Sequence, residues 1–149
     1  MRYDYFVAGR WRNHQAIRGI VEKIRATGKT AYCFIDNEYD AHGVKFGGAA
    51  SADADAMMRQ SENLKDWKTN PTFKEVFETD MQAQHEAKEF ILVFPAGLAA
   101  HMEFGAAYGM GKKCFGIGEI EKTETLYLMF EEIYPDVEAF LDAQVRQPA

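Results

Sequence analysis

The amino-acid sequence predicts an α/β fold: a three-layer Rossmann-like or flavodoxin-like sandwich built on a parallel sheet of about five strands. Short apolar runs typical of strands alternate with segments of helical periodicity along the chain. The run at residues 90–94 is apolar throughout, which is typical of parallel strands buried on both faces. The 149 residues contain no repeat, low-complexity tract or linker, so we expect one domain over residues 1–149.

In the first half of the chain, turn-forming residues separate the predicted elements. Residues 3–8 form a short apolar run, which predicts the first strand. A helical stripe follows between Asn13, which can cap the helix through its side-chain oxygen, and Gly28, which suits the helix end. Residues 30–35 are rich in β-branched and aromatic types and predict a second strand. From residue 36 to about residue 57 the pattern disappears, which predicts a long irregular loop of the kind that is often functional.

The second half of the chain carries stronger signals. Asn70 and Pro71 suit the start of a helix, because asparagine caps free backbone N–H groups and proline lacks the one that would be unpaired there. The elements predicted from this point are a helix from Asn70, a strand at 90–94, a turn at 95–98, a small-residue helix at 99–111, a strand at 113–117, a helix at 125–134 and a last helix from Pro135.

Charge and hydropathy exclude several classes of function. The net charge of −6 argues against non-specific nucleic-acid binding, which needs a basic surface. The longest apolar stretch, residues 90–100, is too short to span a bilayer, and the N-terminus has no signal-peptide pattern. We therefore expect a cytoplasmic protein that binds a small molecule or another protein, with no nucleic-acid or membrane partner.

The sequence also lacks the patterns of metal, redox and cofactor sites. Cys33 and Cys114 form no CxxC pair and no histidines have metal-ligand spacing, so we expect two buried reduced thiols and no metal. Gly105, Gly109 and Gly111 lie inside a predicted helix, beyond the place of a phosphate-binding turn. Walker-type and GxSxG motifs do not occur, and we expect no cofactor.

Two carboxylates stand where an acidic side chain needs an explanation. Asp80 falls on the apolar stripe of its helix, seven residues after Phe73, so it needs a partner or a changed pKa. Either a structural hydrogen bond to a loop or a place in a pocket would explain it. Glu103 is expected in the first turn of the helix after the central strand, where the helix N-terminus favours its anionic form. Because ligands of open α/β sheets bind at this edge, Glu103 is either a solvated glutamate or a catalytic group.

Further candidates lie close to the same predicted edge of the sheet. His101, two residues before Glu103, is either a packing or capping residue or a base. Arg10 and Trp11 follow the first strand directly, and Tyr5 lies within it. An aromatic ring and a cation at this edge can hold a base or a phosphate, although both are also common on protein surfaces.

The strongest motif surrounds Glu103. Residues 94–113 read FPAGLAAHMEFGAAYGMGKK, so a strand leads through a short loop to Glu-x-Gly-x-Ala and then to Gly-Lys before the next strand. This arrangement resembles the core signature of nucleoside 2-deoxyribosyltransferases and related N-glycosidases, and YFVAG at residues 5–9 resembles their opening strand. The likeness covers most of the chain except loop 37–70. A poorly characterised bacterial and phage branch is more similar still, through its pattern Pro-x-Gly-x-x-Ala-His-x-Glu-x-Gly.

The resemblance implies covalent N-glycosidic chemistry on a nucleoside or nucleotide. In it, Glu103 corresponds to the nucleophile, Tyr5 to a tyrosine that orients it, and Asp80 to the residue that contacts the nucleoside and is a candidate acid for the leaving base. The substrate-binding residues expected with them are Gly9, Arg10, Trp11, Gly97 and His101. The family also implies a homodimer or a larger homo-oligomer, for which the aromatic-rich residues 127–134 are a candidate interface.

Two departures from the family pattern leave alternatives open. Residues 95–98 read PAGL where the transferases carry an aspartate, and no asparagine follows Asn70, although the transferases take one from a neighbouring subunit. Both departures favour hydrolysis, or binding without turnover, over transfer. A catalytically silent nucleotide-sensing or interaction module on the same fold is therefore the alternative function. A response-regulator receiver is disfavoured, since Gly9 and Pro95 occupy places where it needs acidic residues.

Overall fold

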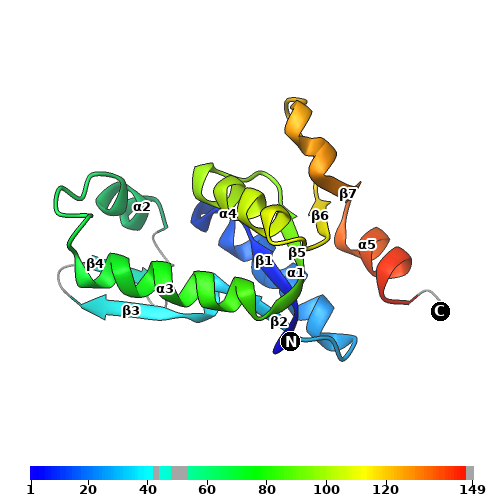
Figure 1. The fold of residues 1–149 in the computed structure, drawn as a ribbon, viewed down its shortest axis with the longest axis horizontal. Helices are drawn as coiled ribbons and strands as arrows, with labels where there is room; N and C mark the ends of the chain where they lie inside the picture. The colour runs from blue at the N-terminus through cyan, green and yellow to red at the C-terminus, as the bar shows by residue number, and fades with distance from the viewer. Residues whose placement is uncertain (42–43, 48–53, 147–149) are drawn as a thin grey trace.

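The computed structural model describes residues 1–41, 44–47 and 54–146 and confirms the predicted α/β architecture (Figure 1). Five parallel strands form the main sheet in the order β2-β1-β5-β6-β7. The strands are β1 (Tyr3–Ala8), β2 (Ala31–Cys33), β5 (Ala87–Val93), β6 (Cys114–Ile117) and β7 (Phe130–Tyr134). The helices are α1 (His14–Ala26), α2 (Ala54–Glu62), α3 (Pro71–His85), α4 (Leu98–Gly109) and α5 (Val137–Gln144).

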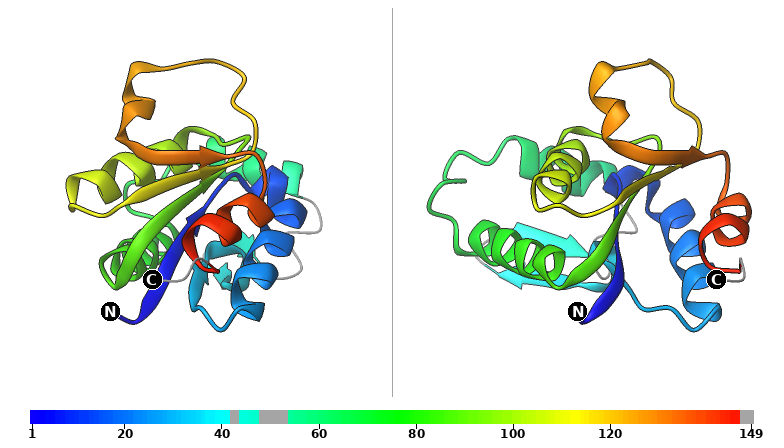
Figure 2. Two further views of the ribbon diagram at one scale, coloured as in Figure 1. Left: turned by 90° about the vertical axis from the view of Figure 1, so that its right-hand side faces the viewer. Right: turned by 45° about the vertical axis from the view of Figure 1, so that its right-hand side comes forward.

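Helices cover both faces of the sheet (Figure 2). Successive side chains of a strand point to opposite faces, so β1 contributes to two cores. Tyr5 and Val7 pack with side chains of α1 and α5, whereas Phe6 and Ala8 pack with side chains of α3 and α4. The strands are therefore apolar on both sides, which is why their sequences read as continuous apolar runs.

The helix ends follow the predicted capping residues with one exception. The Asn70 side chain accepts hydrogen bonds from the backbone N–H groups of Thr72 (3.0 Å) and Phe73 (3.2 Å) at the start of α3. Gly28 follows the end of α1 with φ at 93°, a left-handed conformation that glycine adopts without strain. Asn13 precedes α1, but its side chain does not cap the helix as predicted.

The segment after β2 is more regular than predicted. A 3₁₀ turn, η2 (Phe34–Asp36), leads into an antiparallel hairpin of β3 (Glu38–Ala41) and β4 (Val44–Gly47), and α2 follows. The prediction of an irregular loop was wrong for these residues, while residues 42–43 and 48–53 lie outside the described part. Four-residue strands and a nine-residue helix are too short for periodicity to reveal them.

The prediction of a helix at residues 125–134 was also wrong. This segment forms a 3₁₀ turn, η4 (Thr125–Met129), and then the edge strand β7, which pairs with β6. Aromatic and β-branched side chains such as Phe130 and Ile133 favour a strand beside an existing sheet edge over a weakly patterned helix. With β7 the sheet reaches the expected five strands.

The strand order creates a crevice between β1 and β5. The chain leaves β1 through α1 toward β2 on one side, and it leaves β5 through α4 toward β6 on the other. Neighbouring connections that diverge in this way open a binding site at the carboxyl ends of the two strands.

Candidate active site

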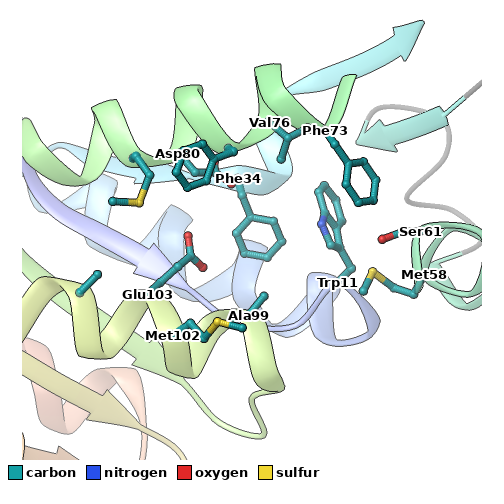
Figure 3. Close-up of a pocket in the computed structure, with 14 residues that line it drawn as sticks. Trp11, Phe34, Met58, Ser61, Phe73, Val76, Asp80, Ala99, Met102 and Glu103 are labelled. Atoms are coloured by element: carbon teal, nitrogen blue, oxygen red, sulfur yellow. The ribbon is translucent and has the colours of Figure 1, made fainter. Parts of the chain in front are cut away.

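A cavity of about 400 Å³ lies where β1 and β5 end, between α3 and α4 (Figure 3). Most of its lining is apolar or aromatic. The large apolar side chains include Trp11, Phe34, Met58, Phe73, Met81 and Met102. Among the described residues that line it, the polar side chains are those of Ser61, Asp80 and Glu103, and no basic side chain is present. Such a cavity suits a small ligand with an aromatic part.

Glu103 points into this cavity from α4, on the side opposite to Asp80 (Figure 3). It lies in the second turn of α4, because the helix begins at Leu98, and not in the first turn as predicted. Within the described part of the chain, no group donates a hydrogen bond to its carboxylate. Burial, with a smaller contribution from the charge of Asp80, raises the pKa of Glu103 to about 8. The expected anionic stabilisation by the helix N-terminus is therefore outweighed by desolvation.

Asp80 differs from Glu103 in having a hydrogen-bond donor. The Tyr32 hydroxyl of β2 donates to Asp80 Oδ1 at 2.6 Å, and Asn37 Nδ2 donates to the Tyr32 oxygen at 2.6 Å. Burial raises the pKa of Asp80 to about 6, and the bond from Tyr32 opposes that rise. At neutral pH the negative charge of the pair therefore lies mainly on Asp80 and the proton mainly on Glu103.

Sequence reasoning missed Tyr32 as a residue of the site. It lies 48 positions before Asp80, and only the pairing of β2 with β1 brings its hydroxyl to α3. The available signal was an aromatic residue with a polar end inside an apolar strand, which usually finds a hydrogen-bond partner when buried.

Gln84 links the two helices that carry the carboxylates. It is fully buried, and its Nε2 donates to the backbone oxygen of Glu103 at 2.6 Å. No sequence pattern assigns Gln84 a role of its own. Because Gln84 lies one turn after Asp80 on α3, this bond sets the position of Glu103 relative to Asp80.

The wall formed by α2 is attached to the β1 end of the cavity by ion pairs. Arg12, in the 3₁₀ turn η1 (Trp11–Asn13), contacts Asp55 at 2.5 Å and Glu62 at 3.2 Å. Met57 of α2 packs in a small apolar cluster with Tyr39. These contacts hold Met58 and Ser61 over the cavity (Figure 3).

Of four other predicted site residues, two line the cavity and two do not. Gly9 and Trp11 line it, and the Trp11 ring meets Phe34 edge-to-face at 4.7 Å. Arg10 and Gly97 are neighbours, since a Cβ on Gly97 would lie 4.0 Å from the Cβ of Arg10, but neither lines the cavity.

Tyr5 lies on the other face of the sheet. It is 3% exposed and packs against Phe140 of α5, with ring centroids 5.5 Å apart, and burial raises its pKa to about 12. Its position in β1 directs it toward α1 and α5, whereas the cavity lies on the side of α3 and α4. The structure therefore does not bring Tyr5 to Glu103, as the resemblance had implied.

His101 also lies outside the cavity. Its Nδ1 donates to the backbone oxygen of Gly97 at 2.8 Å, and its Nε2 pairs with the Tyr127 hydroxyl at 2.9 Å. The imidazole stacks on the Tyr127 ring with centroids 5.8 Å apart, beside a separate cavity of about 220 Å³. Through these contacts His101 links α4 to η4.

Comparison with known proteins supports the fold. No protein-family model matches the chain, and no curated protein matches it. Among solved structures, it is similar to a 2-deoxyribosyltransferase from the psychrotolerant bacterium Bacillus psychrosaccharolyticus, with 15% sequence identity and a TM-score of 0.60. The match covers 95% of this chain and 90% of that one. The two proteins therefore share a fold, as the sequence motif suggested.

Three further findings concern the described residues. None of their helices is long and apolar enough to cross a membrane. In the same residues, no group of three or more histidine, cysteine, aspartate or glutamate side chains is placed to hold a metal ion. Cys33 and Cys114 are both free and buried, as predicted.

Proposed function

We propose that this protein cleaves the N-glycosidic bond of a nucleoside, by hydrolysis or by transfer to a second base, with Glu103 as the nucleophile. The observation that carries the proposal is a pair of carboxyl groups, Glu103 and Asp80, on opposite sides of an aromatic cavity at the carboxyl ends of β1 and β5. The fold shared with a 2-deoxyribosyltransferase supports it.

The lining of the cavity favours an uncharged nucleoside over a 5′-nucleotide. Trp11 and Phe73 present aromatic surface on which a base can stack (Figure 3). A phosphate group would enter an apolar space that holds two acidic side chains and, among the described lining residues, no basic one. A charge buried without a counterion is unfavourable, so a phosphate should weaken binding.

The proposed reaction has two steps that share the carboxyl pair. In the first, a Glu103 oxygen bonds to the anomeric carbon while the bond from that carbon to the base nitrogen breaks. The electron pair of the broken bond goes to the nitrogen, which takes a proton from Asp80. In the second, water or an acceptor base attacks the anomeric carbon, Glu103 leaves as a carboxylate, and the proton of the attacking group passes to Asp80.

This scheme requires the pair to hold one proton. Below a pH of about 6 both carboxyls are protonated, and above about 8 both are ionised. We therefore expect a bell-shaped dependence of kcat/KM with its maximum near pH 7. The proton must also move from Glu103 to Asp80 before attack, so only a small fraction of the singly protonated enzyme is productive. A rate that is independent of pH between 5 and 9 would contradict this scheme.

The experiment that tests the function is chromatographic detection of free base released from a panel of nucleosides and their 5′-monophosphates, with and without an acceptor base. We expect the wild type to release base from a nucleoside. The rate of release should fall by at least ~10³-fold in Glu103→Ala, because the variant lacks the covalent nucleophile. Release from 5′-monophosphates alone would reject the substrate assignment. No release from any compound would reject the reaction.

One observation favours the alternative, a catalytically silent nucleotide-binding, nucleotide-sensing or interaction module on the same fold. Burial raises the pKa of Glu103 to about 8, so its carboxyl is mainly protonated at neutral pH, and a protonated carboxyl is a poor nucleophile. Binding of a nucleoside, measured by calorimetry, without release of base would support this module.

We also propose that the chain self-associates through exposed apolar side chains. Tyr127 packs inward, but its neighbours Leu126 and Leu128 on η4 are 62% and 89% exposed. Burying such residues against a second copy would be favourable. Sedimentation of Leu128→Glu beside the wild type tests this, and a monomeric wild type would refute it.

A further inference from the structure

The hydrogen bond from Tyr32 makes the two oxygens of Asp80 unequal. Oδ1 accepts from the Tyr32 hydroxyl at 2.6 Å. Oδ2 accepts no hydrogen bond from any group in the described part of the chain. Since Asp80 lines the cavity and Tyr32 does not, the oxygen left for a ligand is Oδ2.

The Tyr32 ring is held firmly enough to act as a fixed donor. It is 8% exposed, it stacks on Phe6 with centroids 5.0 Å apart, and it meets Tyr3 at 5.5 Å. Asn37 Nδ2 donates to its oxygen at 2.6 Å, which occupies an acceptor site and directs the hydroxyl hydrogen toward Asp80. A donor locked by packing and by a second hydrogen bond holds a carboxylate in one orientation.

Tyr32 lines a second cavity and not the candidate active site. This second cavity has a volume of about 430 Å³ and is also lined by Tyr3, Asn37 and Thr79. The Tyr32 hydroxyl reaches through to the carboxylate that lines the candidate active site. The residue therefore contacts Asp80 from behind and leaves the cavity itself free for a ligand.

We propose that Tyr32, supported by Asn37, is a positioning residue that fixes the Asp80 carboxyl so that Oδ2 faces the ligand and carries the proton exchanged with the base. This inference rests on the proposed function, which requires a proton on Asp80 during the reaction. It adds a residue of β2 to a site whose two carboxyl groups lie on α3 and α4.

The groups that face Asp80 predict what loss of the bond would do. Glu103 on α4 faces it across the cavity, Tyr32 of β2 donates to it, and Tyr39 of β3 lies near enough to interact electrostatically. Tyr32 is the group among these that stabilises the ionised form of Asp80. Without it, the pKa of Asp80 should rise further, because burial then acts unopposed.

The test compares Tyr32→Phe with Tyr3→Phe. Both changes remove one hydroxyl from neighbouring rings, but only the first removes the bond to Asp80. In protein labelled with ¹³C at the aspartate carboxyl, the Asp80 resonance is assigned by its loss in Asp80→Asn. We expect its titration to move up by about one pH unit in Tyr32→Phe and to stay in place in Tyr3→Phe, since a hydrogen bond to a charged group is worth at least that much.

Two further measurements separate positioning from general destabilisation. Asn37→Ala keeps the Tyr32 hydroxyl but frees it to rotate, so we expect a smaller shift in the same direction, and this variant replaces Tyr32→Phe if the latter fails to fold. The acidic limb of the kcat/KM profile should move up with the titration.

The titration and the base-release assay test the role of Tyr32 and the proposed reaction separately. An Asp80 titration that is unchanged in Tyr32→Phe and Asn37→Ala overturns the inference, whether or not base is released. A shifted titration supports the positioning of Asp80 by Tyr32. If the wild type then releases no base, the reaction is rejected while that role of Tyr32 stands.

Discussion

Glu103 and His101 lie two positions apart on α4, yet the structure gives them opposite surroundings. Residues of an α-helix turn by about 100° each, so two such side chains diverge by about 200° and cannot share a face. His101 has partners for both ring nitrogens, in Gly97 and Tyr127. Glu103 has no donor among the described residues and opens into a cavity. A polar side chain whose partners are all present indicates a structural role, whereas a half-buried carboxyl group that lines a cavity without a donor is a candidate for contact with a ligand.

The largest expected effect separates the two residues by activity. Glu103→Ala should lose base release by at least ~10³-fold, whereas His101→Ala should stay within about threefold of the wild type. The reason is that the imidazole does not line the cavity that would hold the substrate and lies beside a separate one. Steady-state assays of both variants at pH 7 measure the contrast, and a large loss in His101→Ala alone would reverse the assignment.

The second expected effect concerns stability against pH. In the folded protein the pKa of Glu103 is about 8, whereas in the unfolded chain it is near 4.5, so the folded state binds this proton more tightly. The stability from this group is therefore complete at low pH and is lost as pH rises toward 8 and beyond. Glu103→Gln has no charge to bury, so it should be more stable than the wild type at pH 9, by on the order of a few kcal/mol. Denaturant unfolding at pH 5 and pH 9 measures this, and equal pH dependence of the two proteins would disprove it.

The smallest expected effect is a loss of stability when the contacts of His101 with Gly97 and Tyr127 are removed. His101→Ala removes two half-buried hydrogen bonds and a stacking contact with Tyr127, so it should lower the free energy of unfolding by ~1–2 kcal/mol. Glu103→Gln should cause no comparable loss at pH 7. Urea denaturation of both variants tests the difference, with Glu119→Gln, also beside the smaller cavity, as the control for a surface change. A His101→Ala variant as stable as the wild type would show that these contacts do not contribute to the free energy of unfolding.

The sequence predicted the layers of the fold better than the direction of individual side chains. The alternation of strands and helices, the central strand β5 and the capped start of α3 were all readable from patterns. The direction of Tyr5 was not, because β1 is apolar on both faces and such a strand shows no alternation that would tell them apart. The edge strand β7 was mistaken for a helix because its stability comes from pairing with β6.

For the candidate site, the sequence pointed to the two carboxylates but not to what surrounds them. Asp80 stood out as an acid on an apolar stripe, and Glu103 through its motif. Tyr32 and Gln84 could not be found in the same way, since their roles depend on contacts across 48 and 19 positions of the chain. His101 was a different case, because helix geometry alone would have directed it away from Glu103.

The ion pairs of Arg12 have a consequence for ligand binding. They attach α2, and with it Met58 and Ser61, to the turn after β1, and all three charged side chains are exposed to solvent. Dissolved salt screens exposed pairs, which are each worth about 0–1 kcal/mol. The cavity wall on this side should therefore loosen as ionic strength rises, so even an uncharged ligand should bind more weakly in concentrated salt.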